Sequence, residues 1–141
     1  MMDRPRRVLV VEDEDNIALA LDYLMTREGY DHDRVADGGA ALPKIRAMRP
    51  DLVVLDVMLP GVSGYDICRD VRGDPALREV KILMMTARGS SVERRRGQAI
   101  GADGFITKPF ELKELRQEMR RLLAEGEGDR SARFPWRRRG P

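Results

Sequence analysis

Short apolar runs alternate along the chain with stretches in which apolar residues recur every three or four positions. The runs VLVV (8–11), LVVL (52–55) and KILMM (81–85) are typical of strands buried on both faces of a sheet. GFIT (104–107) predicts a further short strand, and residues 31–35 predict a weaker one. The pattern therefore predicts five strands.

Helical spacing fills the segments between these strands. It is carried by Ile17, Leu21, Leu24 and Met25; Ala41, Ile45 and Met48; Ile67 and Val71; and Leu112, Leu115, Met119 and Leu122. A polar helix over about 91–99 completes a set of five. Pro43 lies inside the second helical pattern, so we expect that helix to begin near Leu42 or to begin irregularly. Strands that alternate with helices predict an α/β fold, a parallel sheet with helices on both faces.

Polar residues stand where the apolar runs end. Glu12 and Asp13 follow the first run, Asp56 the second, Thr86 the third and Lys108 the last. In an open parallel sheet, ligands bind in the crevice outside the carboxyl ends of the strands. Taken singly, each acid would be a helix cap or a solvated loop residue, Thr86 a cap or turn residue and Lys108 a surface charge. Together they predict one small site at this edge.

The chemistry of this set is coherent. Clustered carboxylates repel one another unless a cation neutralises them. The chain has a single cysteine, Cys68, and a single histidine, His32, so the expected cation is a hard, oxygen-binding one such as Mg²⁺. A metal ion, an ammonium and a hydroxyl suit a dianionic phosphoryl group, and a carboxylate can accept such a group covalently.

Four segments carry a resemblance to a known family. VLVVEDED, PDLVVLDVMLPGVSG, ILMMTA and GADGFITKPF, in this order, resemble the response-regulator receiver domain of two-component signalling over residues 6–124. The resemblance implies a flavodoxin-like (βα)5 doubly wound fold with sheet order 2-1-3-4-5. Residues 1–5 are then an N-terminal tail, and residues 125–141 are a flexible basic C-terminal tail.

The resemblance also implies roles for the site residues. Asp56 would be the phosphoacceptor for a phosphohistidine on a sensor histidine kinase or a histidine phosphotransfer protein. Asp13 and Asp56 would bind Mg²⁺ through their side chains, together with the backbone carbonyl of Met58, and Glu12 would hold the ion through water. Lys108 would pair with a phosphoryl oxygen.

A conformational switch follows from the same resemblance. The bond from Lys108 to Pro109 would be cis, and Thr86 would swing its hydroxyl onto the phosphoryl group. Phe105 would then turn inward and change the surface of the fourth helix, the fifth strand and the fifth helix. That surface would control the binding of a downstream protein target or the formation of a homodimer. The chain would thus be a single-domain regulator, a signalling module that catalyses only its own phosphotransfer and dephosphorylation, and not a classical enzyme.

Composition and charge limit the alternatives. The chain has 141 residues, 42% of them hydrophobic and 35% charged, enough for one folded domain. No apolar run is long enough to span a bilayer, and with one cysteine the expected location is the cytoplasm. The net charge is +2, but residues 1–7 and 125–141 each carry two excess positive charges, so residues 8–124 carry about −2. Because a DNA-binding domain usually carries its basic excess on the folded body, we do not expect nucleic acid as a partner.

Other functions remain open at this point. The chain could be the receiver half of a longer DNA-binding transcriptional regulator, or a transcription factor that acts through its tails. A phosphohydrolase with an aspartyl nucleophile would need a second acid after Asp56, where Val57 and Met58 stand. A nucleotide-binding site is disfavoured because four acidic residues, and no glycine-rich loop, follow the first strand.

Overall fold

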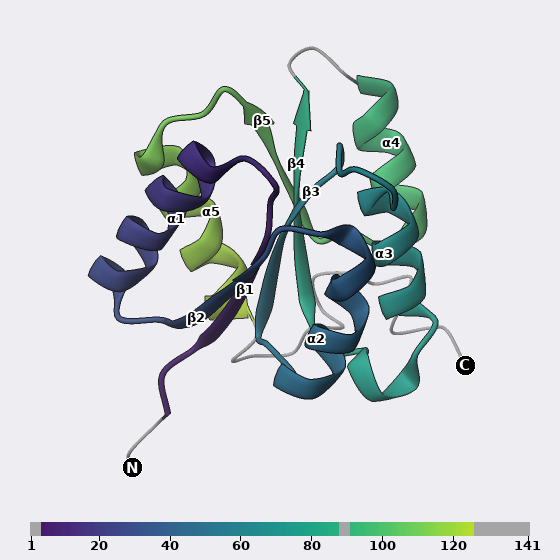
Figure 1. Cartoon of the computed structure of the whole chain (residues 1–141), viewed down its shortest axis with the longest axis horizontal. Helices are drawn as coiled ribbons and strands as arrows, with labels where there is room; N and C mark the ends of the chain where they lie inside the picture. Colours follow the sequence, from purple (N-terminus) through teal and green to yellow (C-terminus); the bar gives the residue numbers. More distant parts are fainter. Residues whose placement is uncertain (1–3, 88–90, 126–141) are drawn as a thin grey trace.

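The computed structural model describes residues 4–87 and 91–125, and these form a single five-stranded sheet between two layers of helices (Figure 1). The strands are β1 (Arg7–Val11), β2 (Asp31–Val35), β3 (Leu52–Asp56), β4 (Lys81–Ala87) and β5 (Gly104–Lys108). All neighbouring strands pair in parallel, in the order β2-β1-β3-β4-β5. The predicted fold class and strand order are therefore confirmed.

Helices cover both faces of the sheet. They are α1 (Asp15–Glu28), α2 (Ala41–Met48), α3 (Gly64–Arg72), α4 (Ser91–Ile100) and α5 (Leu112–Glu125), with short 3₁₀ turns η1 (Gly38–Ala40) and η2 (Pro75–Leu77). Figure 1 shows α1 and α5 on one side of the sheet and α2, α3 and α4 on the other. As expected, the second helix begins irregularly, since η1 precedes it and Pro43 lies in its first turn, where proline is tolerated.

The core consists of two apolar layers separated by the sheet. In β1, Val8 and Val10 pack with α1 and α5, whereas Leu9 and Val11 pack on the opposite face. Every residue of β3 is buried. Side chains alternate between the two faces of a strand, so a strand covered by helices on both faces must be apolar throughout. This requirement explains the continuous apolar runs in the sequence.

Three strands end later than the apolar runs predict. The third apolar run continues as a strand to Ala87, so Thr86 lies within β4 opposite Thr107 and does not follow the end of the strand. Asp56 and Lys108 are likewise the last residues of β3 and β5. The reason is that hydrogen bonding to a neighbouring strand continues past the point where side chains stop being apolar.

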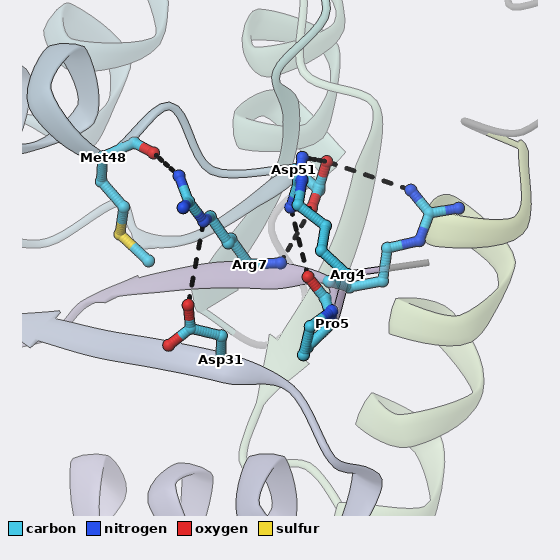
Figure 2. Close-up of polar contacts among 7 residues, drawn as sticks. Arg4, Pro5, Arg7, Asp31, Met48 and Asp51 are labelled. Atoms are coloured by element: carbon cyan, nitrogen blue, oxygen red, sulfur yellow. Dashed lines mark hydrogen bonds and ion pairs between the residues drawn. The ribbon is translucent and has the colours of Figure 1, made fainter. Parts of the chain in front are cut away.

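Charged residues organise the amino-terminal edge of the sheet, shown in Figure 2. The Asp51 carboxylate accepts a hydrogen bond from the backbone N–H of Arg7 at 2.8 Å and pairs with the guanidinium of Arg4 at 3.2 Å. The Arg7 guanidinium donates to the carbonyl of Met48 at 2.9 Å and lies 3.8 Å from Asp31. Arg4, which we assigned to an N-terminal tail, thus contacts the sheet edge. Residues 126–141 of the predicted C-terminal tail lie outside the described residues.

The helices show no sign of a membrane span. Among residues 4–87 and 91–125, none of the helices has the length and the apolar character that crossing a bilayer requires.

The contact between α4 and the sheet depends on a glycine. A Cβ atom at Gly97 would lie 2.6 Å from Cε1 of Phe105 and 3.0 Å from the sulfur of Met84. Gly97 is buried in the middle of α4, where glycine costs about 1 kcal/mol relative to alanine. The helix therefore gives up intrinsic stability so that the Phe105 ring can pack beneath it.

We predict that Gly97→Ala lowers the free energy of unfolding by about 1–3 kcal/mol, because overpacking outweighs the gain in helix propensity. Urea denaturation measures this directly. In the Gly97→Ala background, Phe105→Leu should restore part of the loss.

The matched control is Gly73→Ala at the C-cap of α3, where an added Cβ meets its nearest neighbour, the Arg69 carbonyl, at an ordinary 3.5 Å. That variant should keep or raise the stability. A Gly97→Ala variant as stable as the wild type would contradict the packing argument.

Candidate functional site

The carboxyl edge of the sheet collects the polar residues that follow the apolar runs. Glu12 follows β1 directly, Asp56 ends β3 and Lys108 ends β5. Oxygen atoms of Glu12, Asp13 and Asp56 all lie within 4.8 Å of one another. Glu12 is fully buried, Asp56 is buried and Asp13 is exposed. Three carboxylates thus share one place at the sheet edge, open to solvent on the side of Asp13.

The ammonium of Lys108 links two of these carboxylates. Its Nζ lies 3.0 Å from Oδ2 of Asp56 and 3.0 Å from Oε1 of Glu12. Burial alone would lower the pKa of Lys108, but hydrogen bonds to Asp56 and Glu12 outweigh it and hold the pKa above its ordinary value. The peptide bond that follows, from Lys108 to Pro109, is cis. Lys108 is therefore a permanent positive charge between two acids.

The surroundings of Glu12 disfavour the charged form of its carboxyl group. Burial raises its pKa and the charge of Asp56 adds to the rise, against hydrogen bonds from the Glu14 backbone and from Lys108. The Glu14 N–H donates to Oε2 of Glu12 at 2.9 Å. A second cation placed here would favour the charged form of every carboxylate in the cluster.

The chain after Asp56 turns tightly at the site. The backbone N–H of Met58 donates to Oδ1 of Asp56 at 3.0 Å, while the Met58 side chain is exposed. A Cβ at Gly64 would lie 2.4 Å from the carbonyl oxygen of Asp56. Only glycine permits the first turn of α3 to come this close to the end of β3. The backbone of Met58 is thus held beside the Asp56 carboxylate.

Thr86 lies on β4 and Phe105 on the neighbouring strand β5. The Thr86 hydroxyl is buried and has no hydrogen-bond partner in the described part of the chain. Phe105 is half-buried against the α2–α3–α4 side of the sheet, and the guanidinium of Arg94 lies 5.8 Å from its ring centre. The hydroxyl of Thr86 therefore has unused hydrogen-bonding capacity.

A cleft of about 790 Å³ opens between the loop after β3 and the first turns of α4. It is lined by Asp13, Met58, Leu59, Pro60, Tyr65, Val92 and Arg96, among others. The Arg96 guanidinium lies 4.2 Å from the ring centre of Tyr65, whose hydroxyl donates to the carbonyl of Glu93 at 3.3 Å. The arginines at 94–96 are all exposed, as on a solvated helix face. Arg94 and Arg96 also lie over aromatic rings, which spacing along one helix could not reveal.

The comparison with known families decides the assignment. The model of the response regulator receiver domain matches residues 8–120. The chain belongs to this family. Receiver domains bind Mg²⁺ at an acidic pocket, interact with histidine kinases and downstream targets, and belong to a signalling family that is generally not classed as enzymes.

Individual relatives agree with the family assignment. The receiver domain is 42% identical over 129 residues to the "DNA-binding response regulator MtrA" of Mycolicibacterium smegmatis, covering 91% of this chain and 55% of that protein. A crystal structure of a putative response regulator from Chloroflexus aurantiacus matches with a TM-score of 0.82 and 37% identity, over 86% of this chain and 99% of that one. The receiver domain of the sensor histidine kinase PA1611 from Pseudomonas aeruginosa, described with a magnesium ion coordinated in its active-site cleft, matches with a TM-score of 0.78 and 27% identity, over 86% and 99% of the two chains.

These comparisons do not support two of our expectations. The chain spans about half the length of the curated relatives it matches, which does not support a single-domain regulator. The name of the MtrA relative includes DNA binding, so the expectation that nucleic acid is not a partner is not supported either.

We predict that Lys108→Met lowers the free energy of unfolding by about 2 kcal/mol at pH 7.5 without added metal, since two buried carboxylates lose a charged donor. The pKa of Glu12, already raised, should rise further in this variant. As the pH is lowered from 7.5 to 5, a larger fraction of Glu12 is protonated, the repulsion weakens and the difference from the wild type should shrink. Lys108 itself stays charged throughout, because its pKa is raised and its contribution is lost only at strongly alkaline pH.

Urea denaturation at the two pH values checks this prediction. Lys113→Met, which removes an exposed lysine on α5, is the control and should change the stability by less than about 0.5 kcal/mol at either pH. A Lys108→Met deficit that grew on acidification would contradict the charge balance described here.

Proposed function

We propose that this receiver domain accepts a phosphoryl group on Asp56 from the phosphohistidine of a sensor histidine kinase or of a histidine phosphotransfer protein. The observation that carries the proposal is the Lys108 ammonium, 3.0 Å from both Asp56 and Glu12, beside the carboxylate of Asp13. This arrangement supplies a nucleophile and a cation at one solvent-accessible edge. The chemistry needs little more than positioning and charge neutralisation.

The transfer step involves one bond made and one broken. A carboxylate oxygen of Asp56 attacks the phosphorus of the phosphohistidine, while the P–N bond breaks and its electron pair returns to the imidazole. The product is an acyl phosphate on Asp56. Lys108, released from its role as partner of the carboxylate, pairs with a phosphoryl oxygen.

The donor set fits Mg²⁺, because it consists of hard oxygen ligands within 4.8 Å of one another. Asp13 and Asp56 would hold the ion through their side chains, Met58 through its carbonyl and Glu12 through water. Bound there, Mg²⁺ would neutralise charge on the carboxylates and on the transferred group. Burial raises the pKa of Glu12 and the charge of Asp56 adds to the rise, so a cation bound beside it would favour the charged form of this carboxylate.

Phosphorylation would act through Thr86 and Phe105. The phosphoryl group brings about −1.5 to −2 of charge to the edge of β3. Because the Thr86 hydroxyl has no described partner, it can donate to a phosphoryl oxygen without losing an existing bond. Its movement would free space that Phe105 fills by turning further inward. Such couplings amount to about 1–3 kcal/mol, so both states should be populated without phosphate.

The surface of α4, β5 and α5 would transmit the change to a downstream protein target or to a second copy of the chain. A cleft of about 360 Å³ lies on this surface, lined by side chains of both charges, among them Arg94, Arg121, Glu114 and Glu118. Charged side chains of both signs suit a partner held by complementary ion pairs. The proposed partners fit a cytoplasmic location.

A second candidate is that this is the receiver part of a longer DNA-binding transcriptional regulator. The coverage of the curated relatives favours it, since the chain matches about half of each. The phosphoacceptor chemistry would be the same in both cases. A phosphohydrolase is disfavoured, because Met58 presents an exposed thioether where that chemistry needs an acid.

We predict that incubation with a small-molecule phosphodonor and Mg²⁺ adds one phosphoryl group to the wild type and none to Asp56→Asn, as read by intact mass. Removing Mg²⁺ with a chelator should abolish the adduct. Asp66→Asn, which changes a more exposed acid on α3, is the control and should be phosphorylated like the wild type. Phosphorylation of Asp56→Asn to the wild-type level would overturn the assignment of the acceptor.

We further predict that Thr86→Ala is phosphorylated but no longer conveys the change to α4. NMR amide shifts of residues 91–100 and 104–108, recorded before and after phosphorylation, measure the response. Thr86→Ser keeps the hydroxyl and should respond like the wild type. A Thr86→Ala variant with the full wild-type response would remove Thr86 from the switch.

A further inference from the structure

An arginine on the edge strand holds the acidic loop between β1 and α1. Arg34 lies on β2, opposite Val10 of β1. Its Nε donates to the backbone carbonyl of Glu12 at 3.0 Å, and its Nη1 lies 3.0 Å from Oδ1 of Asp15. One guanidinium thus contacts both ends of the loop formed by residues 12–15.

These contacts enclose Asp13, the exposed member of the acidic cluster. Glu12 is the first residue of the loop, Asp15 is the first residue of α1, and Asp13 and Glu14 lie between them. The backbone N–H of Glu12 also donates to the carbonyl of Val35 at 3.0 Å. The backbone N–H and the carbonyl of Glu12 are therefore both hydrogen-bonded to residues of β2, and these two bonds fix the position of the Glu12 backbone.

The two contacts of Arg34 differ in how much they stabilise the loop. The Asp15 side chain is 91% exposed, so its ion pair with Arg34 contributes little by itself. The bond to the Glu12 carbonyl is half-buried and belongs to the residue whose carboxylate contacts Lys108. A planar guanidinium can donate to both points at a fixed angle, whereas an ammonium cannot.

We propose that Arg34 is a positioning residue for divalent-cation binding, which holds loop 12–15 so that Glu12 and Asp13 face Asp56. The inference rests on the proposed Mg²⁺ role of the cluster and extends it to a residue that would not touch the ion. Residues behind metal ligands commonly change metal affinity 10–100-fold when they are replaced.

The sign of the effect separates positioning from charge. Loss of a positive charge next to the loop that carries two of the three carboxylates would by itself strengthen the attraction of Mg²⁺. Loss of the loop geometry would weaken Mg²⁺ binding instead. Arg34→Met, which keeps the aliphatic stem, and Arg34→Lys, which keeps the charge, therefore test geometry and charge independently.

The experiment is Mg²⁺ titration calorimetry on the full chain, without phosphodonor, for the wild type and three variants. We expect the Kd for Mg²⁺ to rise about tenfold in Arg34→Met and to rise also in Arg34→Lys. Arg46→Met is the matched control, because Arg46 pairs with Asp74 at 3.2 Å and its loss removes the same charge. Its Kd should stay at the wild-type value.

Each other outcome counts against the inference. An unchanged or lower Kd in Arg34→Met would overturn positioning, and so would an equal loss in Arg46→Met. Arg34→Lys with wild-type affinity would overturn the need for a guanidinium, and it decides the matter if Arg34→Met does not fold. A wild-type chain that bound no Mg²⁺ would overturn the proposed metal site itself, and the inference with it.

Discussion

The site is organised by the repulsion among three carboxylates that the fold brings together. Glu12 and Asp13 follow β1 and Asp56 ends β3, more than forty residues later in the sequence, and the carboxyl ends of these adjacent strands place the three within 4.8 Å of one another. Lys108 from β5 offsets part of this repulsion through two contacts of 3.0 Å. A site that is short of positive charge in this way is ready to take up a metal ion and a charged group with it. Burial of the apolar core on both faces of the sheet offsets the free-energy cost of holding these carboxylates together.

Close backbone approaches keep this edge compact. Gly64 allows the start of α3 to reach the end of β3, and Gly97 allows α4 to lie on the ring of Phe105. The amino-terminal edge has no comparable cluster of acids among the described residues, and there Asp51 is surrounded by arginines (Figure 2). At the amino-terminal edge of the sheet, acidic and basic side chains thus pair with one another. At the carboxyl edge, three carboxylates share the single ammonium of Lys108.

Much of this arrangement could be predicted from the sequence, for physical reasons. A strand covered on both faces has to be apolar throughout, so β1, β3 and β4 stand out as continuous runs, and parallel strands bring the residues after them to one edge. The predicted strand order rested on the family resemblance and not on periodicity. The end of β4 could not be predicted in this way, because backbone pairing continues the strand past its apolar run and includes Thr86.

Contacts between distant side chains could not be predicted. Arg34 meets the Glu12 carbonyl only because β2 pairs with β1, and Arg96 meets Tyr65 only because α3 and α4 are neighbours. Neither contact leaves a periodic signal. The close packing of Gly97 against Phe105 could not be predicted for the same reason. From the sequence alone, a glycine within a helix indicates only lower helix stability.

The strand order also has a consequence for how the chain folds. The central pair β1–β3 joins residues more than forty positions apart, Val8 with Leu52, so the sheet cannot begin at its centre until a long loop has closed. β5, which carries Lys108, is the last strand in the sequence and lies at the edge of the sheet. During synthesis from the amino terminus, we therefore expect the three acids to meet before their cation arrives. The docking of the last strand would then both close the core and complete the charge balance of the site.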